Sequence, residues 1–449
     1  MFRFLSLAAT ALLALGQTAS AADRRVVVIT LDGFPAYYLD DPEVDIPVIR
    51  GLRDAGASTE AGMRVSNPSV TWPNHTTLMT GVHPAKHGVI YNGMPERHGV
   101  GEPVTVTRDK TQKELVRVPL LFDVLKKAGM RSAALDWPGT VGSTSLDDQI
   151  PVVAKRVENA TPELKAELQR AGLIKKYNAG GGGERDDVRV EAARWILKER
   201  KPRLLAIHLA ELDSVHHQNG PNTPEGREAA QRVDGRVGEV VKAIDEAGLR
   251  DETALFVIAD HGFIAVDKTI NPNAILVKEG LIEAKDDKIV KARVQVIPEG
   301  GIGMVYLTDP ATRDQDRATV RRLFENAEGV AAVLDAGDFP GLGLPTPENQ
   351  SNMADMIIAA KEGYAVGASV KAKKLVAKRK TQIGKHGYLS TEPKMNALFV
   401  AAGAGIKPGS TTPIIDNVDV APTVAHLLGV ALDQADGRVL TELLSDDAK

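Results

Sequence analysis

The chain has 449 residues, of which 43% are hydrophobic and 25% charged, the ordinary composition of a folded globular protein. Lys and Arg number 55 against 59 Asp and Glu, so the net charge of −4 gives no electrostatic basis for a nucleic acid polymer as a tight partner. There are no cysteines, which excludes disulfides and thiolate metal sites. Any transition metal must therefore be held by histidine and carboxylate.

The first residues have the pattern of a secretory signal peptide. Arg3 precedes an apolar run over residues 4–15, and Ala19-Ser20-Ala21 offers small side chains at a cleavage site. An uncleaved membrane anchor is the alternative, but the run is short for a bilayer core of about 30 Å. We expect residues 1–21 to be removed and the mature protein to be periplasmic or secreted, with no later span of the membrane.

Short apolar runs then alternate with amphipathic stretches along the chain. The runs predict buried strands at 26–31, 132–135, 204–209, 254–259 and 397–401, and the stretches predict helices at 118–128, 162–171, 187–198, 224–247 and 419–428. This alternation predicts an α/β fold with a doubly wound, mostly parallel central sheet flanked by helices.

Two stretches interrupt this alternation. Residues 179–183 contain four consecutive glycines and predict a flexible loop, and the basic run 371–380 predicts a solvated helix face. The second run belongs to a Gly- and Pro-rich stretch with a different pattern. We expect residues 22–265 and 386–449 to form a catalytic core and residues 266–385 to form an inserted cap or lid.

Three aspartates follow the ends of predicted strands. Asp32 comes directly after 26–31, Asp213 shortly after 204–209, and Asp260 directly after 254–259. One such aspartate is commonly a helix cap. Because ligands of open α/β sheets bind beyond the carboxyl ends of the strands, three of them predict a site at one edge of the sheet.

Histidines accompany these aspartates, although the chain has only ten. His261 directly follows Asp260, and His217 comes four residues after Asp213, a spacing that brings two side chains to one side of a helix. His386 lies in a turn-like Gly-Lys-His-Gly-Tyr frame, from which it could reach back to the sheet edge. A single histidine of this kind would more simply be structural. As a group, these imidazole and carboxylate donors suit zinc, with manganese or iron as alternatives.

A possible nucleophile lies in the polar segment 67–77. Thr71 precedes residues that could open a helix, where free backbone N–H groups and the helix dipole favour an alkoxide and a phosphate. An alkyl hydroxyl is a poor nucleophile at neutral pH unless a metal activates it. Without the metal cluster, Thr71 or Ser69 would be read as a helix cap only.

Several motifs occur in one order along residues 26–429: Leu31-Asp32-Gly33, Thr71-Trp72-Pro73-Asn74-His75, Thr80-Gly81 with Pro84, His87-Gly88 and Asn92, Asp213 with His217 and Gly220-Pro221, Asp260-His261-Gly262, and His386-Gly387-Tyr388. Together they resemble the type I phosphodiesterase/nucleotide pyrophosphatase family of the alkaline phosphatase superfamily. The resemblance implies an alkaline-phosphatase-like fold and two zinc ions at the carboxyl edge of the sheet.

The resemblance also implies a role for each matching residue. One zinc would be bound by Asp213, His217 and His386, and the other by Asp32, Asp260 and His261. Thr71 would touch the second zinc and act as the nucleophile, forming a phospho-threonine, while Asn92 would hydrogen-bond a phosphoryl oxygen. The charges of two zinc ions would balance those of three aspartates and a Thr71 alkoxide, so that a phosphoryl anion could bind.

Three positions bear on the substrate. Trp72 matches an aromatic residue on one side of the family's nucleotide-base slot, and His208 replaces a tyrosine on the other side. His216 replaces a glycine and could crowd the first zinc or offer a stray ligand. We expect Trp72, Asn92 and His208 to bind the substrate, while nucleotide preference stays open.

The favoured function is hydrolysis of phosphate diesters or pyrophosphates in a small phosphorylated substrate. The chain shows no clear extra cation for a monoester dianion, and Asp136-Trp137-Pro138-Gly139 resembles a segment of the diesterase members. A phosphomonoesterase and a phosphonoacetate-type phosphonate hydrolase, which would use the same metal site, are the alternatives. An exported zinc-binding protein without catalysis is a further alternative, against which Thr71 and Asn92 argue.

Overall fold

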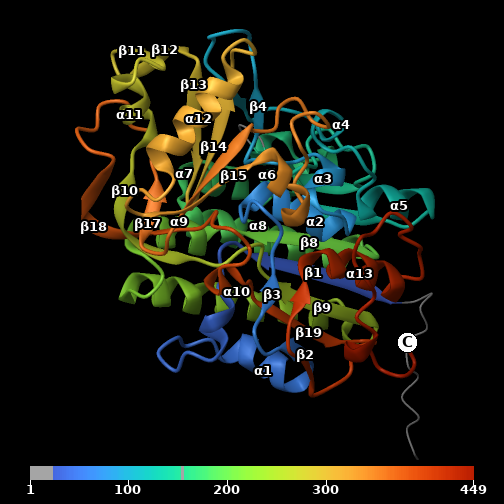
Figure 1. Cartoon of the computed structure of the whole chain (residues 1–449). Helices are drawn as coiled ribbons and strands as arrows, with labels where there is room; N and C mark the ends of the chain where they lie inside the picture. Colours follow the sequence, from blue (N-terminus) through green and yellow to red (C-terminus); the bar gives the residue numbers. More distant parts are fainter. Residues whose placement is uncertain (1–23, 153–155) are drawn as a thin grey trace, which may run out of the picture.

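The computed structural model of the protein describes residues 24–152 and 156–449. The predicted signal peptide lies outside the described residues. A central sheet crosses the molecule, helices flank it, and a group of smaller sheets formed by later residues lies to one side (Figure 1).

The central sheet has eight strands in the order β20-β2-β19-β9-β1-β8-β6-β7. Their bounds are β20 (Ser410–Thr412), β2 (Ala57–Thr59), β19 (Phe399–Gly403), β9 (Thr253–Ile258), β1 (Arg25–Leu31), β8 (Leu204–Leu209), β6 (Ser132–Leu135) and β7 (Asp148–Ile150).

The predicted strands are confirmed, and they pair as a mostly parallel sheet. β1 lies between β9 and β8 and is parallel to both, and β8 and β6 are also parallel, as are β6 and β7. β19 is the exception, because it runs antiparallel to both β9 and β2. The side chains of β8 and β9 are all buried, which explains why these strands read as continuous apolar runs.

Helices flank the sheet in two groups. α8 and α1 both contact α10 and pack on β8 and β19, while α13 and α5 both contact α2 and pack on β1 and β6. The helices are α1 (Pro47–Ala55), α2 (Thr71–Thr80), α3 (Pro84–His87), α4 (Gln112–Leu115), α5 (Leu121–Lys127), α6 (Pro162–Arg170), α7 (Leu173–Ala179), α8 (Gly182–Glu199), α9 (Glu211–Asn219), α10 (Pro224–Glu246), α11 (Pro272–Lys278), α12 (Arg313–Phe324) and α13 (Val420–Leu427). Within the described ranges, none of them is both long and apolar enough to cross a bilayer.

The prediction of a flexible loop over 179–183 is wrong for its second half. Gly182 and Gly183 form the first turn of α8. A Cβ on Gly182 would lie 3.2 Å from the Cα of Glu211, and one on Gly183 would lie 3.1 Å from the Glu211 carboxylate. These glycines therefore let the start of α8 approach the start of α9 closely.

Residues 264–385 build sheets separate from the central one (Figure 1). They form a three-stranded sheet β17-β10-β18, a four-stranded sheet β13-β14-β16-β15 and the hairpin β11-β12. The bounds are β10 (Ile264–Ile270), β11 (Ile282–Lys285), β12 (Lys288–Ala292), β13 (Val294–Glu299), β14 (Ile302–Leu307), β15 (Val330–Asp335), β16 (Met356–Ala360), β17 (Tyr364–Val366) and β18 (Val376–Lys385). The division of the chain into a core and an inserted cap stays a prediction.

The remaining strands form two short ribbons, and the basic run belongs to an edge strand. β3 (Met63–Arg64) pairs with β21 (Ile415–Asp416), and β4 (Met94–Glu96) pairs with β5 (Thr105–Thr107). The helix predicted over 371–380 is wrong, because its second half is the beginning of β18, where residues 377–382 are exposed. Exposed lysines on an edge strand discourage pairing with other chains.

Candidate active site and metal centre

The ends of three neighbouring strands carry five of the six predicted metal ligands. Asp32 follows β1, Asp260 and His261 follow β9, and Asp213 and His217 lie on α9, which begins two residues after β8. His386 comes from outside the central sheet, because it directly follows β18. The parallel pairing of β9, β1 and β8 thus brings residues more than 200 positions apart to one edge of the sheet.

Asp213, His217 and His386 form the first group. The Nε2 atoms of both histidines lie close to Asp213 Oδ1, at 3.4 Å for His217 and 3.6 Å for His386, and 3.2 Å from each other. His386 donates from Nδ1 to the carbonyl of Ser69 at 3.1 Å, which leaves a lone pair on its Nε2. This lone pair and the carboxylate oxygen are both acceptors, so a cation between them would satisfy both.

Asp32, Asp260 and His261 form the second group. His261 Nε2 lies 3.3 Å from Asp32 Oδ1 and 3.4 Å from Asp260 Oδ2. Its Nδ1 contacts the carbonyl of Gly262 at 3.2 Å, so Nε2 again carries the lone pair. His261 Nε2, Asp32 Oδ1, Asp260 Oδ2 and also Asp213 Oδ1 are buried and have no hydrogen-bond partner in the part of the chain that the structure describes. Buried acceptors left in this way are costly, and divalent cations would satisfy them.

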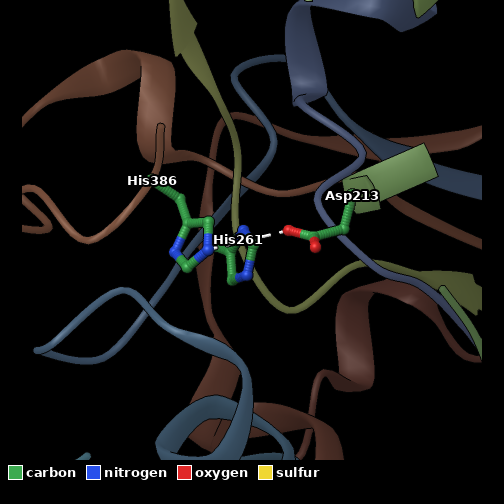
Figure 2. A group of neighbouring side chains, drawn as sticks. All are labelled: Asp213, His261 and His386. Atoms are coloured by element: carbon green, nitrogen blue, oxygen red, sulfur yellow. Dashed lines mark ion pairs between the residues drawn. The ribbon is translucent and has the colours of Figure 1, made fainter. Parts of the chain in front are cut away.

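The two groups adjoin each other. Asp213, His261 and His386 also have ligand atoms that lie within 4.8 Å of one another, and Figure 2 shows these three side chains meeting from separate parts of the chain. The rings of His261 and His386 stack, with centroids 3.8 Å apart. The structure thus brings all six predicted ligands together. The two sets of ligand atoms that lie within 4.8 Å of one another, those of Asp213, His261 and His386 and those of Asp32, Asp260 and His261, share His261, and His217 adjoins the first set.

Burial and charge set the protonation of these ligands. Burial, followed by the carboxylates of Asp260 and Asp213, raises the pKa of Asp32 well above its usual value. Burial, helped by His261 and His217, lowers the pKa of His386, and burial likewise lowers the pKa of His217. Neutral histidines are the form that binds metal, and a cation would relieve the repulsion between the aspartates.

A second layer of histidines lies against the carboxylates. His208 Nδ1 donates to the carbonyl of Asp136 at 2.9 Å, and its Nε2 lies 2.8 Å from Asp32 Oδ2. His75 Nδ1 lies 3.4 Å from Asp260 Oδ2, and the indole of Trp137 donates to the His75 carbonyl. His208 therefore touches a predicted metal ligand, and its role in substrate binding stays a prediction.

His216, which replaces a glycine in the family pattern, points away from both groups. Its Nε2 lies 3.0 Å from the hydroxyl of Tyr38, which itself donates to the carbonyl of Pro221. The ring also packs edge-on against Phe263. His216 is thus part of the packing beneath α9, which agrees with the choice of His217 as the ligand.

Thr71 and Asn92 meet at the start of α2. Thr71 is the first residue of this helix. Pro73 has no N–H and the N–H of Asn74 donates to the carbonyl of Val70, so the first-turn N–H groups not bonded within the helix are those of Thr71 and Trp72. Asn92 Oδ1 accepts a hydrogen bond of 2.8 Å from the backbone N–H of Trp72. With its oxygen engaged, the amide of Asn92 has its Nδ2 hydrogens available to donate to a ligand beside Thr71.

A pocket of about 290 Å³ joins these parts. Thr71, Trp72, His208 and the predicted ligands Asp32 and Asp213 line it, and Trp72 is half-buried there.

Three arginines also line the pocket, namely Arg156, Arg185 and Arg189. The sequence pattern shows no clear extra cation, because these residues lie far from Thr71 in the chain and outside every motif. The one signal in the sequence is the spacing of Arg185 and Arg189, four residues apart, which would place both on one side of a helix. The helix predicted from the sequence begins at 187, after Arg185, so this signal does not apply to it.

Comparison with known proteins decides the family. The family model "Type I phosphodiesterase / nucleotide pyrophosphatase" matches residues 26–389. The chain belongs to this family. Its members are hydrolases of phosphoric esters, and the family resemblance in the motifs is confirmed.

Human ectonucleotide pyrophosphatase/phosphodiesterase family member 1 is 25% identical over 410 residues, which are 90% of this chain and 40% of the relative. The bis(5'-adenosyl)-triphosphatase enpp4 of Mus musculus is 21% identical over 429 residues, which are 92% of this chain and 80% of that protein. The chain thus spans about two fifths of the human relative.

The fold also matches solved structures. Murine ectonucleotide pyrophosphatase/phosphodiesterase 5 superposes with a TM-score of 0.71 at 18% identity, covering 94% of this chain and all of that one. One of its structures is an inactive form with a threonine-to-alanine substitution, in complex with AMP. At this identity the likeness establishes the alkaline-phosphatase-like fold, which confirms the predicted fold class.

Proposed function

We propose that this chain is an exported two-zinc phosphodiesterase/nucleotide pyrophosphatase, in which Thr71 is the nucleophile. The observation that carries the proposal is the set of four buried acceptor atoms, on Asp32, Asp213, Asp260 and His261, that have no hydrogen-bond partner among the described residues. Two of these residues, Asp32 and Asp213, line the same pocket as Thr71. A protein that only bound metal would not need a hydroxyl at a helix start beside them.

The donor set supports zinc as the metal. The ligands are imidazole nitrogens and carboxylate oxygens, and the chain has no cysteine. Asp213, His217 and His386 would hold one ion, and Asp32, Asp260 and His261, with Thr71, the other. When bound, two such ions would lower the pKa of a coordinated hydroxyl and stabilise charge on the attacking and leaving oxygens.

The protein's own groups supply the rest of the reaction. The Thr71 oxygen attacks phosphorus as the bond to the leaving oxygen breaks, which gives a covalent phospho-threonine and releases an alcohol or phosphate. Water then attacks the same phosphorus and returns the Thr71 hydroxyl. Asn92 Nδ2 would donate to a phosphoryl oxygen throughout, because Trp72 N–H fixes its other end.

Diesters or pyrophosphates of small molecules are the proposed substrates. The family model and the names of the relatives support this class. Trp72, half-buried at the pocket beside Thr71, would form one wall for a base or another flat group.

The proposal is tested by paired assays on the zinc-loaded mature protein. We expect faster turnover of a nitrophenyl ester of a nucleoside monophosphate than of nitrophenyl phosphate, and loss of both with a chelator. A monoester preference would instead indicate a phosphatase, and no turnover with two zinc ions bound would overturn the proposal.

A pair of variants tests the nucleophile. Thr71→Val removes the hydroxyl and should abolish turnover while the protein still binds zinc. Thr76→Val is the matched control, because the Thr76 hydroxyl lies one turn later in α2 and donates to the carbonyl of Trp72. We expect the control to keep its activity within a few-fold; full activity in Thr71→Val would refute the mechanism.

A further inference from the structure

We propose that the pocket beside Thr71 recognises a second anionic group of the substrate, a carboxylate or a phosphate, through Arg156 and Arg185. This inference rests on the proposed function, because it names a feature of the substrate that the same site would hydrolyse. It concerns the part of the pocket between α8 and the 3-10 helix Arg156–Asn159, beyond the metal ligands.

The first observation is that one cavity holds both the nucleophile and the cations. Thr71, Trp72, Arg156, Arg185 and Arg189 all line the same pocket of about 290 Å³. A pocket of this size can take a substituent larger than the phosphoryl group itself. A substituent in this pocket therefore lies among side chains that include these guanidinium groups as well as Asp32 and Asp213.

The second observation is that the cations outnumber the carboxylates that pair with them. Arg189 is buried and forms ion pairs with Asp136 and Asp186. Arg156 contacts the same Asp136 oxygen at 2.7 Å, so one carboxylate serves two arginines. The Asp186 carboxylate also accepts hydrogen bonds from the backbone N–H groups of Ala210 and Glu211, at the start of α9.

Arg185 is the arginine without a carboxylate. In the part of the chain that the structure describes, its Nε makes a long contact of 3.4 Å to the carbonyl of Tyr177, and its guanidinium lies 5.6 Å from the Tyr177 ring. No acidic side chain of that part forms an ion pair with it. Arg185 is exposed and can therefore donate to an incoming anion without first breaking an ion pair.

The third observation places these cations close to the metal groups. Asp32, a predicted zinc ligand, contacts His208, whose ring donates to the backbone of Asp136. The Asp136 carboxylate in turn holds Arg156 and Arg189. The anionic group would thus lie near the phosphoryl group on the same substrate, with Trp72 in the same cavity to contact an aromatic or sugar ring between them.

The test uses four diesters with the same nitrophenyl leaving group. The second ester group of each diester is a phenyl ring that carries, at its para position, a carboxylate, a phosphonate, a carboxamide or hydrogen. The carboxamide matches the carboxylate in size without its charge. Comparing the carboxylate ester with the phosphonate ester shows which anion the pocket prefers.

We expect the zinc-loaded protein to prefer an anionic ester over the carboxamide by about tenfold or more in kcat/KM, as hydrogen bonds to a charged group usually give. Arg185→Gln and Arg156→Gln should each bring the ratio of the two kcat/KM values toward one. Arg250→Gln is the matched control, because Arg250 is exposed and pairs with Asp245 on α10, outside the pocket. The control should keep the ratio of the wild type.

A binding measurement separates this inference from the proposed function. Calorimetry on zinc-loaded Thr71→Ala protein would compare 4-carboxyphenyl phosphate with 4-carbamoylphenyl phosphate, which needs no turnover. Turnover of the esters without anion preference, and equal binding of the two phosphates, would overturn the inference and leave the proposed function standing. A binding preference that Arg185→Gln removes, without turnover of any ester by the wild type, would overturn the function alone.

Discussion

Metal removal should lower the thermal stability of this protein by a large and calculable amount. Four buried acceptor atoms, on Asp32, Asp213, Asp260 and His261, have no hydrogen-bond partner within residues 24–152 and 156–449. Each such atom costs about 1–3 kcal/mol, so together they would cost the metal-free protein about 4–12 kcal/mol. Unfolding entropy of a chain of this size is about 0.9 kcal/mol/K, so the expected fall in Tm is about 4–13 °C.

The assay is differential scanning calorimetry of the zinc-loaded protein before and after chelation, with the zinc content measured in both. Asp32→Asn sharpens the test, because the lost charge relieves repulsion from Asp260 in the metal-free state and weakens zinc binding. The Tm gap between the two states should therefore shrink in this variant. Asp314→Asn, at a carboxylate that is 97% exposed, should leave the gap unchanged. A chelated wild type that has lost its zinc but keeps its Tm within about a degree would refute the reasoning.

Three further predictions follow from single contacts. Asn92→Asp keeps the acceptor for the Trp72 N–H but loses the amide donor, so kcat in the diester assay should fall about 10²–10³-fold, and a fall of less than threefold would remove Asn92 from the reaction. Gly183→Ala places a Cβ 3.1 Å from the Glu211 carboxylate and should lower the unfolding free energy by about 1 kcal/mol in urea titrations, whereas Gly235→Ala, with open space around it, should not. Burial, and next the nearby His83, lower the pKa of His87 to about 3, so below pH 6.5 the unfolded chain binds a proton that the folded chain does not. As the pH falls from 6.5 to 3, this residue should lower the unfolding free energy by up to about 1.4 kcal/mol per pH unit. Urea titrations at pH 7 and 5 should show a smaller loss of stability in His87→Gln than in the wild type, and an equal loss would contradict this role of His87.

The central strands, and the gathering of Asp32, Asp213, Asp260 and His261 at one edge of the sheet, could be predicted because each rests on a local signal. β1, β8 and β9 are buried on both faces, so they appear as unbroken apolar runs, and the sheet rule places the residues that follow them at one edge. His217 follows from its helical spacing to Asp213. His386 follows β18, which belongs to another sheet, so only its turn-like frame and the family motif indicated it.

The predictions that were wrong concern segments whose structure depends on contacts with residues distant in sequence. β18 is an edge strand that pairs only with β10 and exposes residues 377–382, so its charges show no alternation and resemble a helix surface. The glycines at the start of α8 predict a loop from the sequence alone, because their close approach to Glu211 is visible only in the fold. Arg156 and Arg185 were missed because only the fold brings them beside Thr71.

The stereochemistry at phosphorus tests the central claim, a covalent intermediate on Thr71, most directly. A nitrophenyl nucleoside phosphorothioate of one configuration would be hydrolysed by the zinc-loaded protein in ¹⁸O-labelled water, and the configuration of the product determined by ³¹P NMR. Attack by Thr71 and then by water inverts the phosphorus twice, so the account predicts retention. Net inversion would mean that water attacks directly, and would contradict the account.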